Sequence, residues 1–196
     1  MITIIDYKSG NLRSISNGFK KINCDVEITN DVEKISDASH LVLPGVGAFG
    51  SAMNNIEPFK DVIYEHINDD KPFLGICLGQ QLLMSKSQES KDIKGLNIFK
   101  GSTDYLPVDL KIPHMGWNKL KVIQKNPILE DIDGKYFYFI HSYHVVPEDN
   151  SVISATTDYG IEIVASLHEN NIFSTQFHPE KSGKYGLKIL KNFIKI

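Results

Sequence analysis

The amino-acid sequence predicts an α/β fold, in which helices flank a central, mainly parallel sheet that gains antiparallel strands in the second half of the chain. In the first half, short β-branched runs alternate with helical periodicities, and strands joined through helices become parallel neighbours. In the second half, strand-like runs are separated by turn residues alone, which is typical of antiparallel pairing. With 196 residues and 41% hydrophobic residues, we expect one domain over 1–196.

The first-half elements rest on two signals. Compact apolar runs indicate buried strands, and apolar residues spaced three or four apart indicate helices. Glycine and proline end the runs, as Pro44 and Gly45 do after the third strand. We expect strands over 2–5, 24–28, 41–43 and 73–76, and helices over 11–21, 59–68 and 80–85.

The second half changes character, because turn pairs such as Asn126-Pro127 and Asp133-Gly134 separate its apolar runs. A final segment has apolar residues at helical spacing and closes the chain. We expect strands over 120–123, 136–140, 151–155, 161–167 and 172–177, and a helix over 185–196.

Composition and charge exclude several classes of protein. The chain carries 21 Lys+Arg against 24 Asp+Glu, a net charge of -3, whereas nucleic-acid binding needs a basic face. No apolar run approaches the roughly 20 residues of a membrane span, and the N-terminus lacks the pattern of a signal peptide. Two cysteines, Cys24 and Cys77, are too few for a disulfide scaffold. We expect a cytoplasmic protein whose partners include neither nucleic acid nor membrane.

The sharpest chemical signal is the sequence Gly75-Ile76-Cys77-Leu78-Gly79, at the end of an expected strand. A nucleophile on a tight strand-to-helix turn needs glycine two residues to either side, because side chains there would collide. The thiol then stands near a helix N-terminus, which favours the thiolate, and the Leu78 N–H points to where an oxyanion would form. The alternative is a buried cysteine in a glycine-rich turn.

A thiolate nucleophile needs a base, and Phe177-His178-Pro179-Glu180 supplies one with an orienting carboxylate. In an extended segment the side chains of His178 and Glu180 project to one side. Glu180 would then accept a hydrogen bond from one ring nitrogen while the other faces Cys77. The alternative is a surface turn with a solvated ion pair.

Other residues suggest no cofactor and no metal. The remaining histidines lack thiol or carboxylate companions at zinc-ligand spacing, and no phosphate-binding glycine motif is present. Cys24 is expected to be a small core residue. The segment Pro44-Gly45-Val46-Gly47 follows a strand next to the elbow, where a second oxyanion N–H would be needed.

Together the motifs resemble a known family, the class I (triad) glutamine amidotransferases. Three segments carry this resemblance: 44–50 (PGVGAFG), 75–83 (GICLGQQLL) and 176–180 (QFHPE). Three more are similar to the glutaminase subunits of imidazole glycerol phosphate synthase: 6–12 (DYKSGNL), 113–118 (PHMGWN) and 139–143 (FIHSY). The resemblance extends over nearly the whole chain. Gln80 departs from it, since the family pattern has Met there.

The resemblance implies the site roles. Cys77 attacks the side-chain amide of glutamine to give a γ-glutamyl thioester and ammonia, His178 acts as base and then acid, and Glu180 orients it. The implied oxyanion hole comprises Leu78, Val46 and Gly47. The implied glutamine-binding residues are Gly47, Gln81, Glu89, Ser142 and Tyr143.

The resemblance also implies a heterodimer with a cyclase subunit, a (β/α)8 barrel that uses the ammonia to make imidazole glycerol phosphate and AICAR in histidine biosynthesis. Free ammonia is mostly protonated near neutral pH, so its transfer needs a sheltered path. The implied interface or tunnel-mouth residues are Asn11, Trp117, Tyr138 and Lys181, although Trp117 could equally be a core residue. Low activity without the partner would follow if the Gly45–Val46 peptide turned its carbonyl into the oxyanion hole.

Two alternatives stay open at this point. A paralogous triad glutaminase could feed ammonia to a different acceptor enzyme, such as a sugar amidotransferase, with the same catalytic residues. A non-catalytic interaction subunit is the other, and the intact set Cys77, His178 and Glu180 argues against it.

Overall fold

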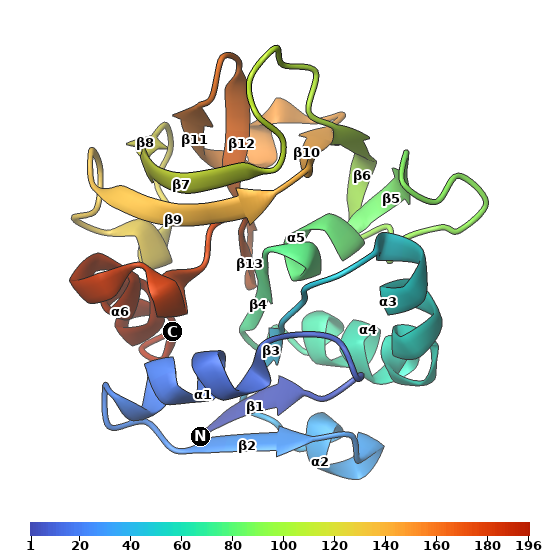
Figure 1. Ribbon diagram of the computed structural model, residues 1–196. Helices are drawn as coiled ribbons and strands as arrows, with labels where there is room; N and C mark the ends of the chain where they lie inside the picture. Colours follow the sequence, from blue (N-terminus) through green and yellow to red (C-terminus); the bar gives the residue numbers. More distant parts are fainter.

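The fold is organised around an eight-stranded sheet, seen in a computed structural model that describes residues 1–196 (Figure 1). Its strand order is β2-β1-β3-β4-β13-β12-β11-β8. Pairing is parallel from β2 to β13 and antiparallel from β13 to β8. The strands are β1 (Ile2–Ile5), β2 (Val26–Thr29), β3 (His40–Leu43), β4 (Phe73–Ile76), β8 (Lys121–Val122), β11 (Ile153–Asp158), β12 (Glu162–Glu169) and β13 (Ile172–Thr175).

Helices cover both faces of the parallel part because successive strand residues point to opposite faces. Ile4 packs with Ile15 and Phe19 of α1, whereas the next residue, Ile5, packs in the second core with Phe49. One face holds α1 (Leu12–Lys20) and α6 (Gly183–Phe193); the other holds α2 (Val32–Ser36), α3 (Phe49–Ile56), α4 (Lys60–Asn68) and α5 (Leu78–Leu82). Figure 1 shows the two groups on either side of β1, β3 and β4.

Two smaller sheets complete the molecule. A three-stranded sheet, β10-β6-β5, uses β5 (Met84–Ser87), β6 (Phe99–Tyr105) and β10 (Tyr143–Pro147). A two-stranded ribbon pairs β7 (His114–Lys119) with β9 (Tyr136–His141), drawn together in Figure 1. Phe137 and Phe139 on β9 are buried. The 3-10 helices are η1 (Glu57–Phe59), η2 (Pro127–Leu129), η3 (Asn150–Val152) and η4 (Pro179–Lys181).

The predicted fold class is confirmed, including the antiparallel addition, which is β13-β12-β11-β8. The helix expected over 80–85 is wrong in its bounds: α5 begins at Leu78 and ends at Leu82, and β5 follows directly. Cys24 precedes β2 instead of lying on it, and it packs against the core as a partly buried residue. No helix has the length and apolar composition to cross a membrane.

Candidate active site

Cys77 occupies a strained turn between β4 and α5. Its φ of 56° and ψ of -107° lie where side chains are rarely found, and such strain is typical of nucleophile elbows. A Cβ atom on Gly79 would lie 2.1 Å from the carbonyl oxygen of Leu43 on β3. Glycine is therefore required at position 79, because α5 begins in contact with the neighbouring strand.

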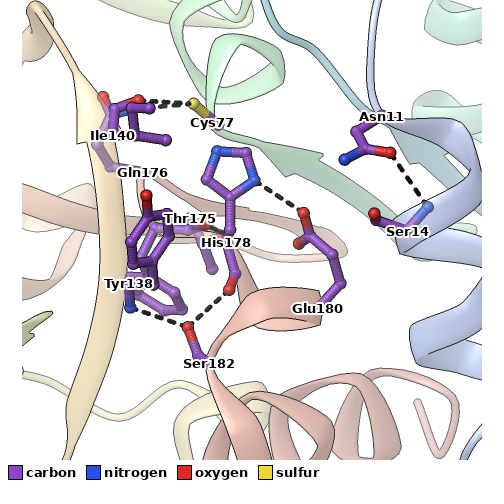
Figure 2. Close-up of polar contacts among 11 residues, drawn as sticks. Asn11, Ser14, Cys77, Tyr138, Ile140, Thr175, Gln176, His178, Glu180 and Ser182 are labelled. Carbon is purple, nitrogen blue, oxygen red and sulfur yellow. Dashed lines mark hydrogen bonds and ion pairs between the residues drawn. The ribbon is translucent and has the colours of Figure 1, made fainter. Parts of the chain in front are cut away.

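His178 and Glu180 form a buried pair beside the cysteine. Nδ1 of His178 lies 2.8 Å from Oε1 of Glu180, and the side chains are 2% and 0% exposed. Figure 2 shows the other edge of the imidazole turned toward Cys77. The pair is joined through the 3-10 turn η4 rather than through an extended segment as expected. The alternative of a solvated surface ion pair is wrong.

The imidazole is held by its own backbone. The N–H of His178 donates to the Tyr138 carbonyl at 2.9 Å, and Ser182 Oγ donates to the His178 carbonyl at 2.6 Å (Figure 2). The Tyr138 N–H in turn donates to Ser182 Oγ at 3.0 Å. These hydrogen bonds connect the segment that follows β13 to β9. Both elements therefore fix the position of the His178 ring.

The electrostatics favour a protonated imidazole. Burial lowers the pKa of His178, but its neighbours Cys77 and Glu180 outweigh burial and raise this pKa from 6.5 to about 10. A pKa of about 10 favours the imidazolium form of His178 at neutral pH. A thiolate facing an imidazolium is the reactive form of a cysteine nucleophile.

Two contacts at the Cys77 sulfur escaped sequence reasoning. The thiol donates toward the Ile140 carbonyl, with Sγ and oxygen 3.8 Å apart, and Nε2 of Gln176 lies 3.7 Å from Sγ (Figure 2). Gln176 sits in the same motif as His178, so its proximity in sequence was a usable signal. Ile140 acts through its backbone, which leaves no signal in a side-chain pattern.

A cavity of about 280 Å³ opens onto the nucleophile. All five residues expected to bind glutamine line it, and so does the whole expected oxyanion set. His178 and Glu180 are not in its wall. The lining residues are Val46, Gly47, Cys77, Leu78, Gln81, Glu89, Ile140, His141, Ser142 and Tyr143.

Glu89 supplies the single carboxylate of this wall. Its Oε2 accepts a hydrogen bond from the backbone N–H of Phe49 at 2.7 Å, the first residue of α3. The start of a helix favours negative charge, so the carboxylate is held at a defined place beside the cavity. It gives the wall a site for a cationic group such as an ammonium.

The segment between β3 and α3 forms the opposite lip of the cavity. The Tyr7 hydroxyl donates to the Pro44 carbonyl, and Ser9 Oγ donates to the Val46 carbonyl at 2.9 Å. Gly47 has a φ of 111°, which glycine adopts without strain. A Cβ on Gly45 would lie 2.7 Å from both Leu78 Cβ and the Tyr7 hydroxyl, so this lip has no space for a side chain.

The expected interface residues lie outside the cavity. Trp117 is 53% exposed, so its interpretation as a core residue is wrong. It stands opposite Tyr138 across the ribbon, with ring centroids 6.1 Å apart, and Lys181 Nζ lies 5.9 Å from the Tyr138 ring centroid. Asn11 instead caps α1, its side-chain oxygen accepting from the Ser14 N–H at 3.3 Å.

Metal binding finds no support in the arrangement of side chains, since no group of three His, Cys, Asp or Glu residues could hold an ion. The buried histidines of the ribbon contact each other instead. His114 Nδ1 and His141 Nε2 are 3.1 Å apart, and His141 Nδ1 donates to the Tyr143 carbonyl at 2.8 Å. Burial lowers the pKa of His141 to about 3, so that ring is neutral.

Comparison with known proteins places the chain in a family. The family model of class-I glutamine amidotransferases matches residues 3–196. Imidazole glycerol phosphate synthase subunit HisH of Methanothermobacter thermautotrophicus is 52% identical, covering 100% of this chain and 98% of that protein. The subunit HisH of Methanocaldococcus jannaschii is 48% identical, covering 100% of both chains.

Solved structures show the same fold at low identity. A glutamine amidotransferase crystal structure superposes with a TM-score of 0.79 at 14% identity, covering 99% of this chain and 97% of the other. The structure of PurLQS from Thermotoga maritima gives a TM-score of 0.75 at 17% identity, with the same coverage. The full-length matches show that the chain belongs to the class-I glutamine amidotransferases and, among them, to the family of imidazole glycerol phosphate synthase subunit HisH.

Proposed function

We propose that this chain is the glutaminase subunit of imidazole glycerol phosphate synthase, and that it hydrolyses glutamine to glutamate and ammonia. The observation that carries the proposal is the Cys77 elbow, which lines the cavity and adjoins the buried His178–Glu180 pair. Membership of the family supports the same reading.

The chemistry follows from the positions of these three groups. Cys77 Sγ attacks the side-chain amide carbon of glutamine, and the imidazolium of His178 gives a proton to the departing nitrogen. Ammonia leaves, and a γ-glutamyl thioester remains on Cys77. The neutral imidazole then takes a proton from water as the water oxygen attacks the thioester. The carbon–sulfur bond breaks, which releases glutamic acid (it ionises to glutamate) and restores the Cys77 thiolate beside the protonated His178.

Developing negative charge on the amide oxygen requires donors at the cavity. We assign the Leu78 N–H to this role, because Leu78 is the first residue of α5 and lines the cavity beside Cys77. Val46 and Gly47 are the second candidates, from the opposite lip. The Val46 carbonyl accepts a hydrogen bond from Ser9 Oγ, which holds this lip in its present conformation.

The cavity also suits the rest of the substrate. The Glu89 carboxylate matches the α-ammonium of glutamine in charge, and Ser142 and Tyr143 line the same cavity. Gln81 Nε2 donates hydrogen bonds to the Tyr143 carbonyl and to Oε1 of Gln176. The Oε1 atom of Gln81 therefore remains for the substrate.

The ammonia acceptor is proposed to be the cyclase (β/α)8-barrel subunit, bound at the exposed face of the β7–β9 ribbon. The names of the relatives describe a subunit, which supports a heterodimer. Three exposed side chains crowd this ribbon, namely Met115 (55%), Trp117 (53%) and Tyr136 (56%). Exposed aromatic residues are enriched where proteins bind partners.

The decisive experiment measures glutamate release from glutamine with and without the cyclase subunit and its nucleotide ligand. Cys77→Ala provides the blank. We expect release that rises on addition of the partner and disappears in Cys77→Ala. Release that persists in Cys77→Ala would contradict the nucleophile, and release that no cyclase subunit changes would contradict the proposed acceptor.

A further inference from the structure

Gln176 is the fourth side chain at the reaction centre, and the proposed triad leaves it without a role. It directly follows β13, its side chain is completely buried, and its backbone N–H donates to the Ala165 carbonyl at 2.9 Å. A buried primary amide is costly unless its polar atoms are paired. Both ends of this amide have partners, one of which is Cys77.

The orientation of the Gln176 amide is fixed by a chain of contacts that begins at the cavity wall. Gln81 Nε2 lies 3.0 Å from the Tyr143 carbonyl, which can only accept, so the NH₂ group of Gln81 is on this side. The same nitrogen lies 3.1 Å from the Gln176 side chain, which must present its oxygen there. The Gln176 NH₂ group therefore points to Cys77 Sγ, at 3.7 Å. The reverse orientation would set two NH₂ groups against each other.

We propose that Gln176 is a further catalytic residue, which donates a hydrogen bond to the Cys77 thiolate and is aimed at it by Gln81. The inference rests on the proposed function, because it concerns the nucleophile of that reaction. An N–H donor stabilises the thiolate more than the thiol, since hydrogen bonds to a charged acceptor are the stronger ones. The Ile140 carbonyl has the opposite preference, because it accepts from the thiol.

This arrangement also connects the substrate wall with the nucleophile. Tyr143 lines the cavity, its carbonyl holds Gln81, and Gln81 holds Gln176. A substrate that displaced Gln81 from Tyr143 would loosen the donor at the sulfur, whereas one that preserved this contact would keep the thiolate stabilised. Gln81 is thus a positioning residue for the nucleophile in addition to its predicted contact with glutamine.

The test measures the rate of alkylation by iodoacetamide against pH, which reports the thiolate without requiring glutamine hydrolysis. All variants carry Cys24→Ser, because Cys24 is partly exposed and would react as well. Gln176→Met removes the donor with little change in length. Gln80→Met is the matched control, since Gln80 is equally buried and bonds to Ser174 rather than to the sulfur.

We expect the pH of half-maximal alkylation to rise by about one unit in Gln176→Met, with roughly tenfold slower reaction on the acid side, and to stay unchanged in Gln80→Met. Gln176→Glu keeps the shape of the side chain but puts a negative group beside the sulfur. It should raise the pH of half-maximal alkylation at least as far as Gln176→Met does. An alkylation profile of folded Gln176→Met that matched the parent would overturn the proposal.

Gln176→Glu distinguishes a hydrogen-bond donor from a residue that only fills space. If Gln176 only filled space, the near-isosteric Glu variant would have an alkylation profile closer to that of the parent than the Met variant has. Circular dichroism and thermal unfolding establish that each variant is folded. If Gln176→Glu does not fold, the proposal is tested by comparing the alkylation profiles of Gln176→Met and Gln80→Met. If the alkylation shift appears while the parent releases no glutamate even with the cyclase subunit and its nucleotide ligand present, the thiolate contact stands and the proposed function fails instead.

Discussion

Glu180 holds the proton of the His178 imidazole in place. The ring is 2% exposed, so burial alone would drive its pKa below the usual 6.5. The pKa is instead raised to about 10 by Cys77 and Glu180. The carboxylate, whose Oε1 lies 2.8 Å from Nδ1, thus stabilises the protonated form of the imidazole.

Replacing Glu180 with Gln keeps an acceptor for Nδ1 but removes the negative charge. We expect the pKa of His178 to fall, and glutamate release in the activated complex to fall by about two orders of magnitude. An NMR titration of the His178 ring and a glutaminase assay measure the two effects. A His178 titration that did not move would contradict the role of the carboxylate.

The same charge sets a pH dependence of stability. The folded-state pKa of His178, about 10, lies above its ordinary 6.5, so the folded state binds the proton more tightly. This contribution is complete below pH 6.5 and is lost as pH rises toward 10. Chemical denaturation between pH 6.5 and 10 should show falling stability, and Glu180→Gln should reduce the slope.

At the scale of single residues, Cys77, His178 and Glu180 could be predicted from the sequence because each belongs to a motif whose chemistry requires that residue type, and the structure brings the three together (Figure 2). It assigned no role to Gln176, since the amide acquires its meaning from Gln81, which lies 95 positions away. Backbone acceptors such as the Ile140 carbonyl are invisible to residue identity.

At the scale of elements, the elbow depends on how closely α5 approaches β3. A Cβ on Gly79 would lie 2.1 Å from the Leu43 carbonyl oxygen and 3.1 Å from its carbon. Both are backbone atoms of a central strand, which cannot move without breaking the sheet. The elbow and the strand beside it therefore constrain each other.

We expect Gly79→Ala to destabilise the fold by about 2–4 kcal/mol and to abolish glutamate release, because the start of α5 must shift. Gly183→Ala is the comparison, since Gly183 has a φ of 61° but nothing within 4 Å of its Cβ position. Its free energy of unfolding should fall by only roughly 1 kcal/mol, because alanine is strained at this positive φ. Urea unfolding measures both, and equal losses would show that collision with β3 is unimportant.

The elements themselves were predictable to different degrees. The central strands β1, β3 and β4 were found because each is dominated by a compact apolar run, and β4 begins at Phe73 and ends at Ile76 as expected. The edge strand β2 (VEIT) alternates instead, and it begins and ends later than the expected 24–28. The strands β6 and β7 were missed because polar residues, glycine and exposed positions interrupt them: β7 contains Gly116 and an exposed Met115. Their positions are decided by pairing with distant partners, which no local pattern contains.

At the scale of the whole molecule, the ribbon has two unlike faces. Residues paired across β7 and β9 share a face, so His114 and His141 meet on the buried side, whereas Trp117 and Tyr138 meet on the other. The buried face reaches the cavity through His141. The opposite face is where the proposed partner would bind, and it too reaches the cavity, through Ile140, which pairs with Met115.

Trp117→Ala tests this placement of the partner. Trp117 is 53% exposed, so its removal should change the free energy of unfolding by less than about 1 kcal/mol. If the cyclase subunit covers the ribbon, the loss of this side chain should weaken the complex by about 2 kcal/mol or more, as measured by calorimetric titration. The control is Ile28→Ala, because Ile28 is also exposed (41%) but lies on β2, at the far edge of the main sheet.

The Ile28→Ala variant should bind the cyclase subunit with the affinity of the parent. Equal binding by both variants would exclude the ribbon as the docking face, while leaving the glutaminase chemistry at Cys77 untouched.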